Sequence, residues 1–199
     1  LHMFDVDLPT GESARESYER MIAAVDAAER FAVARAKTPP RPREETLIDV
    51  AERRAAMLAP VLRGLLAEPS GDADRPFRRC VVRPLVERAV LDFVDAGGAR
   101  ERALTPAVTA DHLIRTKALP AFVDAPAWDD AARLREQLAA AVDASAAAYR
   151  ACFERHRARL PEGVAAMDPR PRVVLVPGLG ALCAGEDARA ADVARDITR

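Results

Sequence analysis

Apolar residues recur at steps of three and four along three stretches of the chain, and this spacing gathers them on one face of a helix. The first stretch covers residues 13–35 and opens with the S-x-x-E spacing of a capping box. The second covers residues 44–65, and the third and longest covers residues 128–159. The pattern predicts three amphipathic helices, the second of them broken or kinked at Pro60, because proline has no N–H to give to a helix.

Shorter apolar runs between turn-forming residues predict strands. Residues 173–176 read V-V-L-V, which is typical of a strand buried on both faces, and residues 79–82 and 121–123 are two briefer candidates. We expect Pro84 in the first turn of a following helix, and Asp187 as the cap of a terminal helix. Together these elements predict a helix-rich α/β fold with a small sheet.

Proline-rich residues indicate where the chain divides. The T-P-P-R-P run within residues 38–45 cannot continue a helix, since proline also restricts the residue that precedes it. We therefore expect residues 1–37 to close one domain, residues 38–45 to form a linker, and residues 46–199 to form a second domain. Within that domain, residues 99–127 are interrupted by prolines and are expected to be loop apart from one brief strand.

Composition narrows the classes of partner. The chain has 199 residues, 50% of them apolar and 31% charged, and no apolar run approaches the roughly 20 residues that span a bilayer. A net charge of −1 gives no whole-chain argument for binding nucleic acid or an anionic membrane, so neither is expected as a partner. Three widely spaced cysteines, expected in the core, and the lack of a secretory leader favour the cytoplasm. A first methionine at position 3 and a last helix without a stop signal indicate a piece of a longer protein.

The densest group of chemically useful side chains lies within residues 109–117. It combines His112, Arg115 and Lys117, which offer an acid or base near neutral pH, a fork for phosphate or carboxylate, and a point charge. These three residues are the candidate binding site for an anionic small molecule. The alternative is a solvated helix start in which Asp111 is the cap, while Arg115 and Lys117 face water.

Other chemistry is less well supported by the sequence. The glycines of residues 177–180 lack the complete G-x-G-x-x-G and P-loop patterns, so a tight turn from strand to helix is the simpler interpretation. His2, His112 and His156 are too scattered to predict a zinc site, and His156 lies on the apolar stripe of a helix, where a structural role is more common. No metal ligand and no catalytic residue can be assigned from the sequence.

Several segments resemble bifunctional proteins that join a class II aldolase/adducin-type domain to a short-chain dehydrogenase, of the rhamnulose-1-phosphate aldolase/lactaldehyde dehydrogenase type. The most specific strings are D-H-L-I-R-T-K and R-V-V-L-V-P-G-L-G. The matching segments, in the order of the family, are residues 14–22, 111–117, 149–150, 153–156 and 168–180. The resemblance implies a three-layer α/β fold, zinc held by histidines in the aldolase domain, and NAD in the dehydrogenase domain.

The resemblance also places this chain between the two active sites. The last metal-binding histidine of the family stands in a His-Gly pair, whereas residues 1–10 here hold His2 without a following glycine, so no metal ligand is carried over. Residues 11–15 read G-E-S-A-R and residues 185–189 read G-E-D-A-R. This similarity suggests that the segment from Val173 onward is a degenerate second copy of the aldolase's closing strand–loop–helix, with residues 179–180 near the place of the His-Gly pair. The alternative is chance convergence of two helix starts. The resemblance thus implies neither zinc nor NAD within this chain.

These observations lead to one functional hypothesis and two alternatives. In the first, the chain is a part of a bifunctional sugar-phosphate aldolase/dehydrogenase and is not a complete catalyst alone. His112, Arg115 and Lys117 then hold a sugar phosphate or a small aldehyde, and the neighbouring domains are catalytic. The second is a docking or oligomerisation module, with a homo-oligomer as one outcome, that packs through the helix at residues 128–159. The third is an independent ligand-binding domain. An exposed apolar stripe on that helix favours the second, and a pocket where the three side chains converge favours the first.

Overall fold

The computed structural model describes residues 13–35, 45–106 and 109–199. The chain forms two compact units, residues 1–42 and 43–199, and each is described by itself. The expected linker at residues 38–45 lies almost entirely outside the described residues, so the domain boundaries stay a prediction.

The first unit contains one described helix, α1 (Ala14–Arg35). Its predicted capping box is present: Ser13 Oγ accepts from the Glu16 N–H at 3.3 Å, and the Ser13 N–H donates to the Glu16 carboxylate at 2.8 Å. The same hydrogen bonds lower the pKa of Glu16, because they stabilise its charged form. The large apolar residues of this helix are exposed: Tyr18, Met21, Ile22, Val25, Phe31 and Val33.

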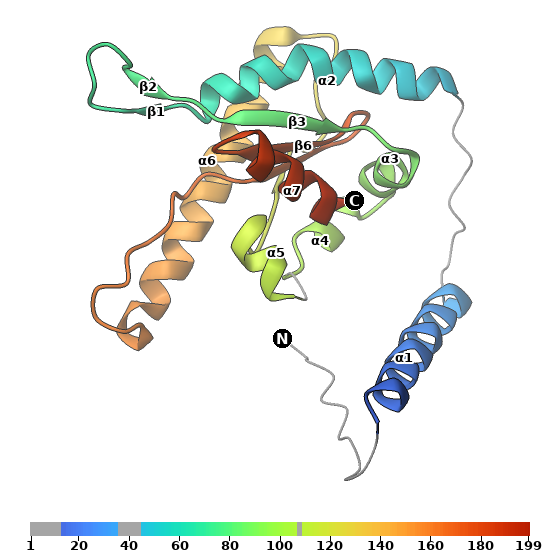
Figure 1. The fold of residues 1–199 in the computed structure, drawn as a ribbon. Coiled ribbons are helices and arrows are strands. Elements are labelled where there is room, and N and C mark those ends of the chain that lie inside the picture. Colours follow the sequence, from blue (N-terminus) through green and yellow to red (C-terminus); the bar gives the residue numbers. More distant parts are fainter. Residues whose placement is uncertain (1–12, 36–44, 107–108) are drawn as a thin grey trace. The chain divides into compact units, whose positions relative to one another are not determined.

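A four-stranded mixed sheet forms the centre of the second unit (Figure 1). Its strands lie in the order β3 (Val81–Leu85), β6 (Gly180–Gly185), β5 (Val173–Val176) and β4 (Ala121–Phe122). Strand β6 is antiparallel to both of its neighbours, while β4 pairs with β5 in parallel. The strands predicted around residues 173–176 and 121–123 are therefore confirmed.

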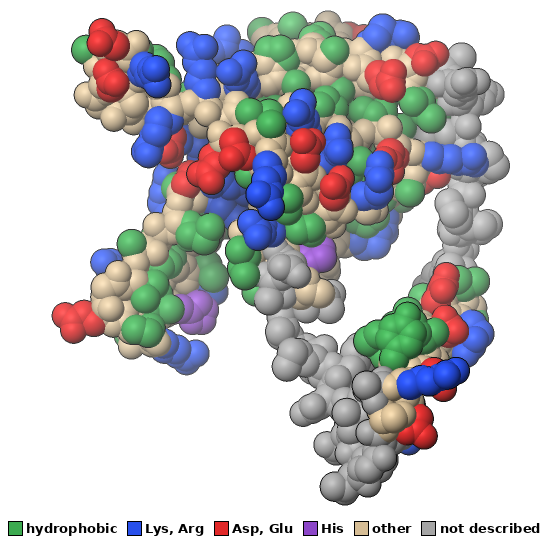
Figure 2. All heavy atoms as spheres, in the orientation of Figure 1, with side chains coloured by type: hydrophobic (Ala, Val, Ile, Leu, Met, Phe, Trp, Pro, Cys, Tyr) green, Lys and Arg blue, Asp and Glu red, His purple; other side chains and the backbone are tan. Residues whose placement is uncertain are grey.

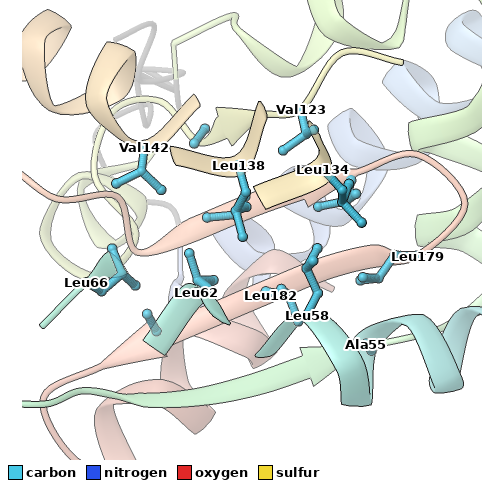
Figure 3. Packing of buried hydrophobic residues seen from close by; sticks show 14 of the residues in the cluster. Ala55, Leu58, Leu62, Leu66, Val123, Leu134, Leu138, Val142, Leu179 and Leu182 are labelled. Atoms are coloured by element: carbon cyan, nitrogen blue, oxygen red, sulfur yellow. The ribbon is translucent and has the colours of Figure 1, made fainter. Parts of the chain in front are cut away.

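Helices cover both faces of this sheet. On one face, α2 (Glu45–Leu65) and α6 (Ala131–His156) pack against Val174, Val176 and Leu182 (Figure 3). On the other face, α3 (Arg88–Asp95) and α7 (Ala188–Thr198) pack against the alternate residues of the same strands: Val173, Leu175, Ala181 and Cys183. Because successive side chains of a strand point to opposite faces, the sheet is buried on both sides. The predicted helix-rich α/β fold with a small sheet is confirmed.

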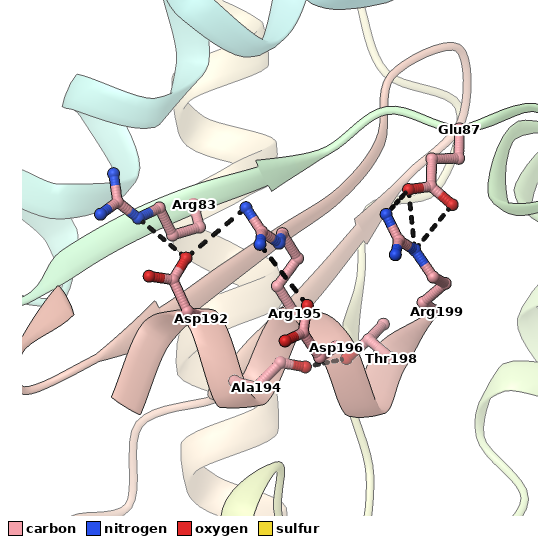
Figure 4. A network of polar contacts seen from close by, with 8 residues as sticks. All are labelled: Arg83, Glu87, Asp192, Ala194, Arg195, Asp196, Thr198 and Arg199. Atoms are coloured by element: carbon pink, nitrogen blue, oxygen red, sulfur yellow. Dashed lines mark hydrogen bonds and ion pairs between the residues drawn. The ribbon is translucent and has the colours of Figure 1, made fainter. Parts of the chain in front are cut away.

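Ion pairs fasten the terminal helix to the rest of this unit (Figure 4). Asp192 on α7 accepts from Arg83 on β3 at 3.2 Å and from Arg195 at 3.5 Å. Arg199 donates through Nε to the Glu87 carboxylate at 2.8 Å. These pairs are partly solvated, so we assign most of the stability of α7 to its buried face, which includes Ala191 and Ala194.

On the face shown in Figure 2, basic and acidic side chains are interleaved.

Several local expectations are wrong. Pro84 lies inside β3 rather than in a helix; β3 is an edge strand, where the missing N–H of a proline is tolerated. Helix α2 continues through Pro60, so the expected break is wrong, while a kink at Pro60 stays a prediction. The residues expected to be loop contain two short helices, α4 (Ala99–Ala103) and α5 (Ala110–Arg115). A small hairpin of β1 (Glu68–Pro69) and β2 (Phe77–Arg78) was also not predicted.

The glycines of residues 177–180 join β5 to β6 as a hairpin turn, so the expected turn from strand to helix is wrong. Strand β6 was missed because its sequence, G-A-L-C-A-G, lacks the β-branched and aromatic residues that mark a strand. Small residues are required at its ends. A Cβ on Gly180, whose φ is 107°, would lie 2.5 Å from the Leu85 carbonyl oxygen, and one on Gly185 would lie 2.2 Å from the Ala191 nitrogen.

Candidate functional site

Two cavities of the second unit meet at Lys117. The larger, of about 490 Å³, lies beside the second half of α6 and is lined by Lys117, Tyr149, Phe153 and His156, among others. The smaller, of about 270 Å³, is lined by Lys117 together with residues of α3, α5 and α7. Cavities of a few hundred cubic ångströms are typical of small-molecule sites, and the two cavities that share Lys117 form the candidate functional site.

Lys117 is held in an unusual conformation at the point where the chain leaves α5. Its φ is 68°, in the left-handed region that residues other than glycine rarely adopt. The residue is only 7% exposed, and its Nζ donates to the main-chain carbonyl of Asp168. The ring of Tyr149 lies 4.5 Å from Nζ, within range of a cation–π interaction. A strained backbone and a buried amine at a cavity wall are features that functional sites often share.

Burial lowers the pKa of Lys117 from 10.5 to about 8, because the ammonium loses hydration. The nearby Asp168 carboxylate opposes this shift and the Arg172 guanidinium adds to it. Both carboxylates near the amine have arginine partners: Asp168 pairs with Arg172 at 3.3 Å, and Glu68 pairs with Arg170. A substantial fraction of this amine is therefore neutral at mildly alkaline pH, and the neutral form is the nucleophile and base.

His112 lines the smaller cavity with Lys117 and is half-buried on α5. Its Nδ1 lies 2.8 Å from the hydroxyl of Thr109, which also accepts the His112 main-chain N–H at 3.5 Å as the cap of the helix. Thr109 is therefore the N-cap of α5. The alternative interpretation, which made Asp111 the cap, is wrong on this point. The hydrogen bond to Thr109 fixes the plane of the imidazole at the wall of the cavity.

Arg115 does not join the other two. It is exposed and lines neither of these two cavities, while His112 and Lys117 share the smaller one. Successive side chains of a helix point in different directions around its axis, so only some of those on α5 can face the protein. The structure therefore brings together His112 and Lys117, and a binding role for these residues stays a prediction.

The residues that α6 contributes to the larger cavity were not predicted as site residues. Tyr149, Phe153 and His156 continue the stripe of its buried residues by steps of three and four, and all line this cavity. His156 is exposed, so the expectation of a partly buried structural histidine is wrong. Cys152 is also exposed at the cavity, against the expectation of a core residue, whereas Cys80 and Cys183 are buried as expected. Burial raises the pKa of the Cys183 thiol to about 11.

The turn between β5 and β6 is a structural feature. The Gly178 carbonyl accepts from Arg54 Nη1 at 3.0 Å, and the Gly178 N–H donates to the Asp95 carboxylate at 2.6 Å. Trp128 stacks on the Arg54 guanidinium at 4.2 Å. Side chains of the protein therefore occupy the main-chain groups that a glycine loop could offer to a ligand. Leu179, near the expected place of the His-Gly pair, is fully buried.

The resemblance implies zinc for the full-length family. Within residues 13–35, 45–106 and 109–199, no group of three or more His, Cys, Asp or Glu side chains is placed to hold a metal ion. The described residues therefore do not fit a zinc site. None of the described helices is long and apolar enough to cross a membrane.

Comparison with known proteins identifies the family. Residues 53–199 match the family model described as aldolase class II, second domain. A curated relative, the uncharacterized oxidoreductase YuxG of Bacillus subtilis (strain 168), is 24% identical over 186 residues, which are 88% of this chain and 25% of the relative. The chain thus spans about a quarter of the length of that relative. No solved structure matches this chain.

Proposed function

The chain belongs to the class II aldolase family, whose second domain its residues 53–199 match, and from this premise we propose that it is part of a bifunctional sugar-phosphate aldolase/short-chain dehydrogenase of the rhamnulose-1-phosphate type. One observation supports the proposal: the same chain matches both an aldolase-type domain and a relative named as an oxidoreductase. Three quarters of that relative lie outside the match, which leaves length for further catalytic domains.

The role proposed for this chain is binding rather than aldol cleavage. A class II aldolase uses a metal ion to polarise the substrate carbonyl and to stabilise the enediolate. In this proposal, zinc and NAD are held by neighbouring domains, and His112 and Lys117 hold the phosphate or carboxylate of a sugar phosphate, or an aldehyde product. Exposed Arg115 contributes only long-range attraction for an anion.

The binding role is supported by the charge balance around Lys117. Its Nζ contacts a main-chain carbonyl and an aromatic face, which stabilise a cation without cancelling its charge. The Asp168 carboxylate, which could have cancelled it, pairs with Arg172. An anion or a polarised carbonyl entering the cavity therefore meets a desolvated amine, and electrostatic interactions are stronger there than in water.

Isothermal titration calorimetry with rhamnulose 1-phosphate, dihydroxyacetone phosphate and lactaldehyde, with and without zinc, tests this role. We expect at least one compound to bind without zinc, and its binding to be lost in Lys117→Met and His112→Ala but only weakened in Arg115→Ala. Arg150→Ala is the matched control, because Arg150 is an exposed arginine of α6 that lines neither cavity. Absence of binding by the folded chain contradicts the binding role.

The assignment to a bifunctional enzyme needs the full-length protein. We expect it to cleave a ketose 1-phosphate in a zinc-dependent reaction and to oxidise an aldehyde with NAD. A full-length protein that performs neither reaction contradicts the assignment, whatever this chain binds.

Association through α6 and the loop that follows it is the second candidate function. Leu160 and Met167 line the rim of the larger cavity and are 36% and 51% exposed, and Val164 between them is 49% exposed. Molar mass by light scattering tests this candidate. A dimer that Met167→Glu converts to a monomer supports it, and a monomer at all concentrations contradicts it.

A further inference from the structure

A buried lysine is uncommon, and this one lines an apolar cavity. The larger cavity of about 490 Å³ is lined mainly by apolar side chains of α5, α6 and the segment at residues 117–122. Lys117 is 7% exposed and borders it, and the phenol ring of Tyr149 lies 4.5 Å from the lysine Nζ. If this position served only the stability of the fold, a methionine would stabilise the folded state more than a lysine does, because burying an ammonium costs the free energy of its hydration.

We infer that this cavity binds a small aliphatic aldehyde or ketone, whose carbonyl carbon condenses reversibly with the amine of Lys117 to form an imine. The inference deepens the proposed function and rests on it for the role of the site. It names the carbonyl group, rather than a phosphate, as the feature recognised, because the remaining walls of the cavity are apolar and fit a short hydrocarbon chain.

The chemistry balances with the groups present. The Lys117 nitrogen forms a bond to the carbonyl carbon, and one of its protons passes to the carbonyl oxygen to give a carbinolamine. The nitrogen lone pair then forms the C=N bond as the C–O bond breaks. The leaving hydroxyl takes a proton from a donor and departs as water, and the second amine proton returns to that donor. No oxidant or reductant is needed.

We expect Tyr149, whose ring lies 4.5 Å from the lysine Nζ, to supply that proton. Its hydroxyl oxygen accepts from the Met167 N–H at 2.8 Å, which orients the phenol at the cavity wall and leaves its own O–H directed elsewhere. In this proposal Tyr149 exchanges a proton with the carbinolamine and receives one back from nitrogen.

Reductive trapping tests the inference. The 199-residue chain is incubated with propionaldehyde and sodium cyanoborohydride, which converts an imine to a stable secondary amine, and the modified peptides are identified by mass spectrometry. The sequence contains only two lysines, Lys37 and Lys117, so the peptides that carry them are distinguished from each other and from the α-amino group of Leu1. We expect Lys117 to be modified with saturable dependence on aldehyde concentration, at least tenfold faster than Lys37 at pH 8.

The pH profile separates this amine from an ordinary one. Since the pKa of Lys117 is about 8, its rate of modification should level off above that pH. The rate at an amine with a pKa near 10.4 would keep rising beyond pH 9. Equal, unsaturable modification of both lysines would overturn the inference.

Three variants keep the test independent of folding defects at Lys117. Ala144→Leu adds bulk to the cavity wall on α6 and leaves the lysine in place, so the rate of modification should no longer saturate with aldehyde concentration. Ala147 lies on the same helix but does not line the cavity, so Ala147→Leu should leave this saturation unchanged. Tyr149→Phe should slow trapping at least fivefold while saturation persists. If Ala144→Leu saturates as the wild type does, the carbonyl compound does not occupy this cavity.

This result is distinguishable from failure of the proposed function. If calorimetry shows that sugar phosphates bind but no aldehyde is trapped at Lys117, only the inference of an imine is contradicted. Trapping at Lys117 by a full-length protein without aldolase or dehydrogenase activity would contradict only the assignment to the bifunctional enzyme.

Discussion

The two halves of α6 carry the same apolar stripe and use it differently. In the first half, Leu134, Leu138 and Val142 are between 0% and 4% exposed and pack against α2 and the sheet (Figure 3). In the second half, Tyr149 and Phe153 are only half-buried and line a cavity. The helix continues past the region covered by the sheet, as Figure 1 shows, so its second half has fewer elements to pack against.

The difference teaches what an amphipathic pattern specifies. The spacing of apolar residues determines which face of a helix avoids water, because that face is fixed by the helical period. It does not determine whether the space beside that face is filled by the core or left as a cavity. A functional site can therefore continue a core stripe without a change in the pattern.

The largest expected effect comes from truncating the core half. Leu138→Ala removes a side chain with 0% exposure, and we expect a loss of about 2–5 kcal/mol in the free energy of unfolding, from lost burial and the cavity created. Urea denaturation measures it. Phe153→Ala in the cavity half is the comparison and should cost about 1 kcal/mol or less, because part of that ring already faces open space. Equal losses in the two variants would show that both halves belong to one core.

The next effect is a pH dependence from the cavity half. The pKa of Lys117 falls from 10.5 to about 8 on folding, so the unfolded chain binds more protons between these values and the free energy of unfolding rises with pH across that window. Wild type should gain about 2 kcal/mol relative to Lys117→Met between pH 7.5 and pH 10.5. Urea denaturation at a series of pH values measures the difference. A constant difference would mean that the amine is solvated in the folded state.

A smaller effect is expected at the start of α6. The Asp130 carboxylate accepts from the Arg133 N–H at 3.0 Å and caps the helix beside its core half. Asp130→Ala should lower the free energy of unfolding by about 1 kcal/mol, since a main-chain donor loses its partner. Thermal unfolding monitored by circular dichroism checks it, with Asp129→Ala as the control, because Asp129 is an exposed neighbour that is not the cap.

The smallest effect is expected where α6 ends. Arg157 pairs with Glu154 at 3.1 Å, and both side chains are more than half exposed. Arg157→Ala should change the free energy of unfolding by less than about 0.5 kcal/mol, because exposed ion pairs are screened by water. The same thermal unfolding experiment measures it. A loss larger than that of Asp130→Ala would reverse the comparison between the two ends.

Local signals in the sequence located much of the fold. The capping residues Ser13 and Asp187, the long third helix and the strand at residues 173–176 all follow from interactions within a few residues. The pairing of β6 with β3, which places Pro84 inside a strand, could not be predicted in this way, because it joins residues about 100 positions apart in the sequence. Glycine and alanine suit β6 only because the Leu85 carbonyl and α7 approach it closely.

For the candidate site, the sequence by itself determined that His112, Arg115 and Lys117 lie close together along the chain, and that α6 has one apolar face. Only the tertiary structure decided that Lys117 is buried, that Arg115 stays outside, and that Tyr149 lies over the amine. The physical reason is that burial and pKa depend on what packs around a side chain. At Lys117 that environment comes from α6 and from Asp168, which are distant in sequence and meet only when the sheet and its helices assemble.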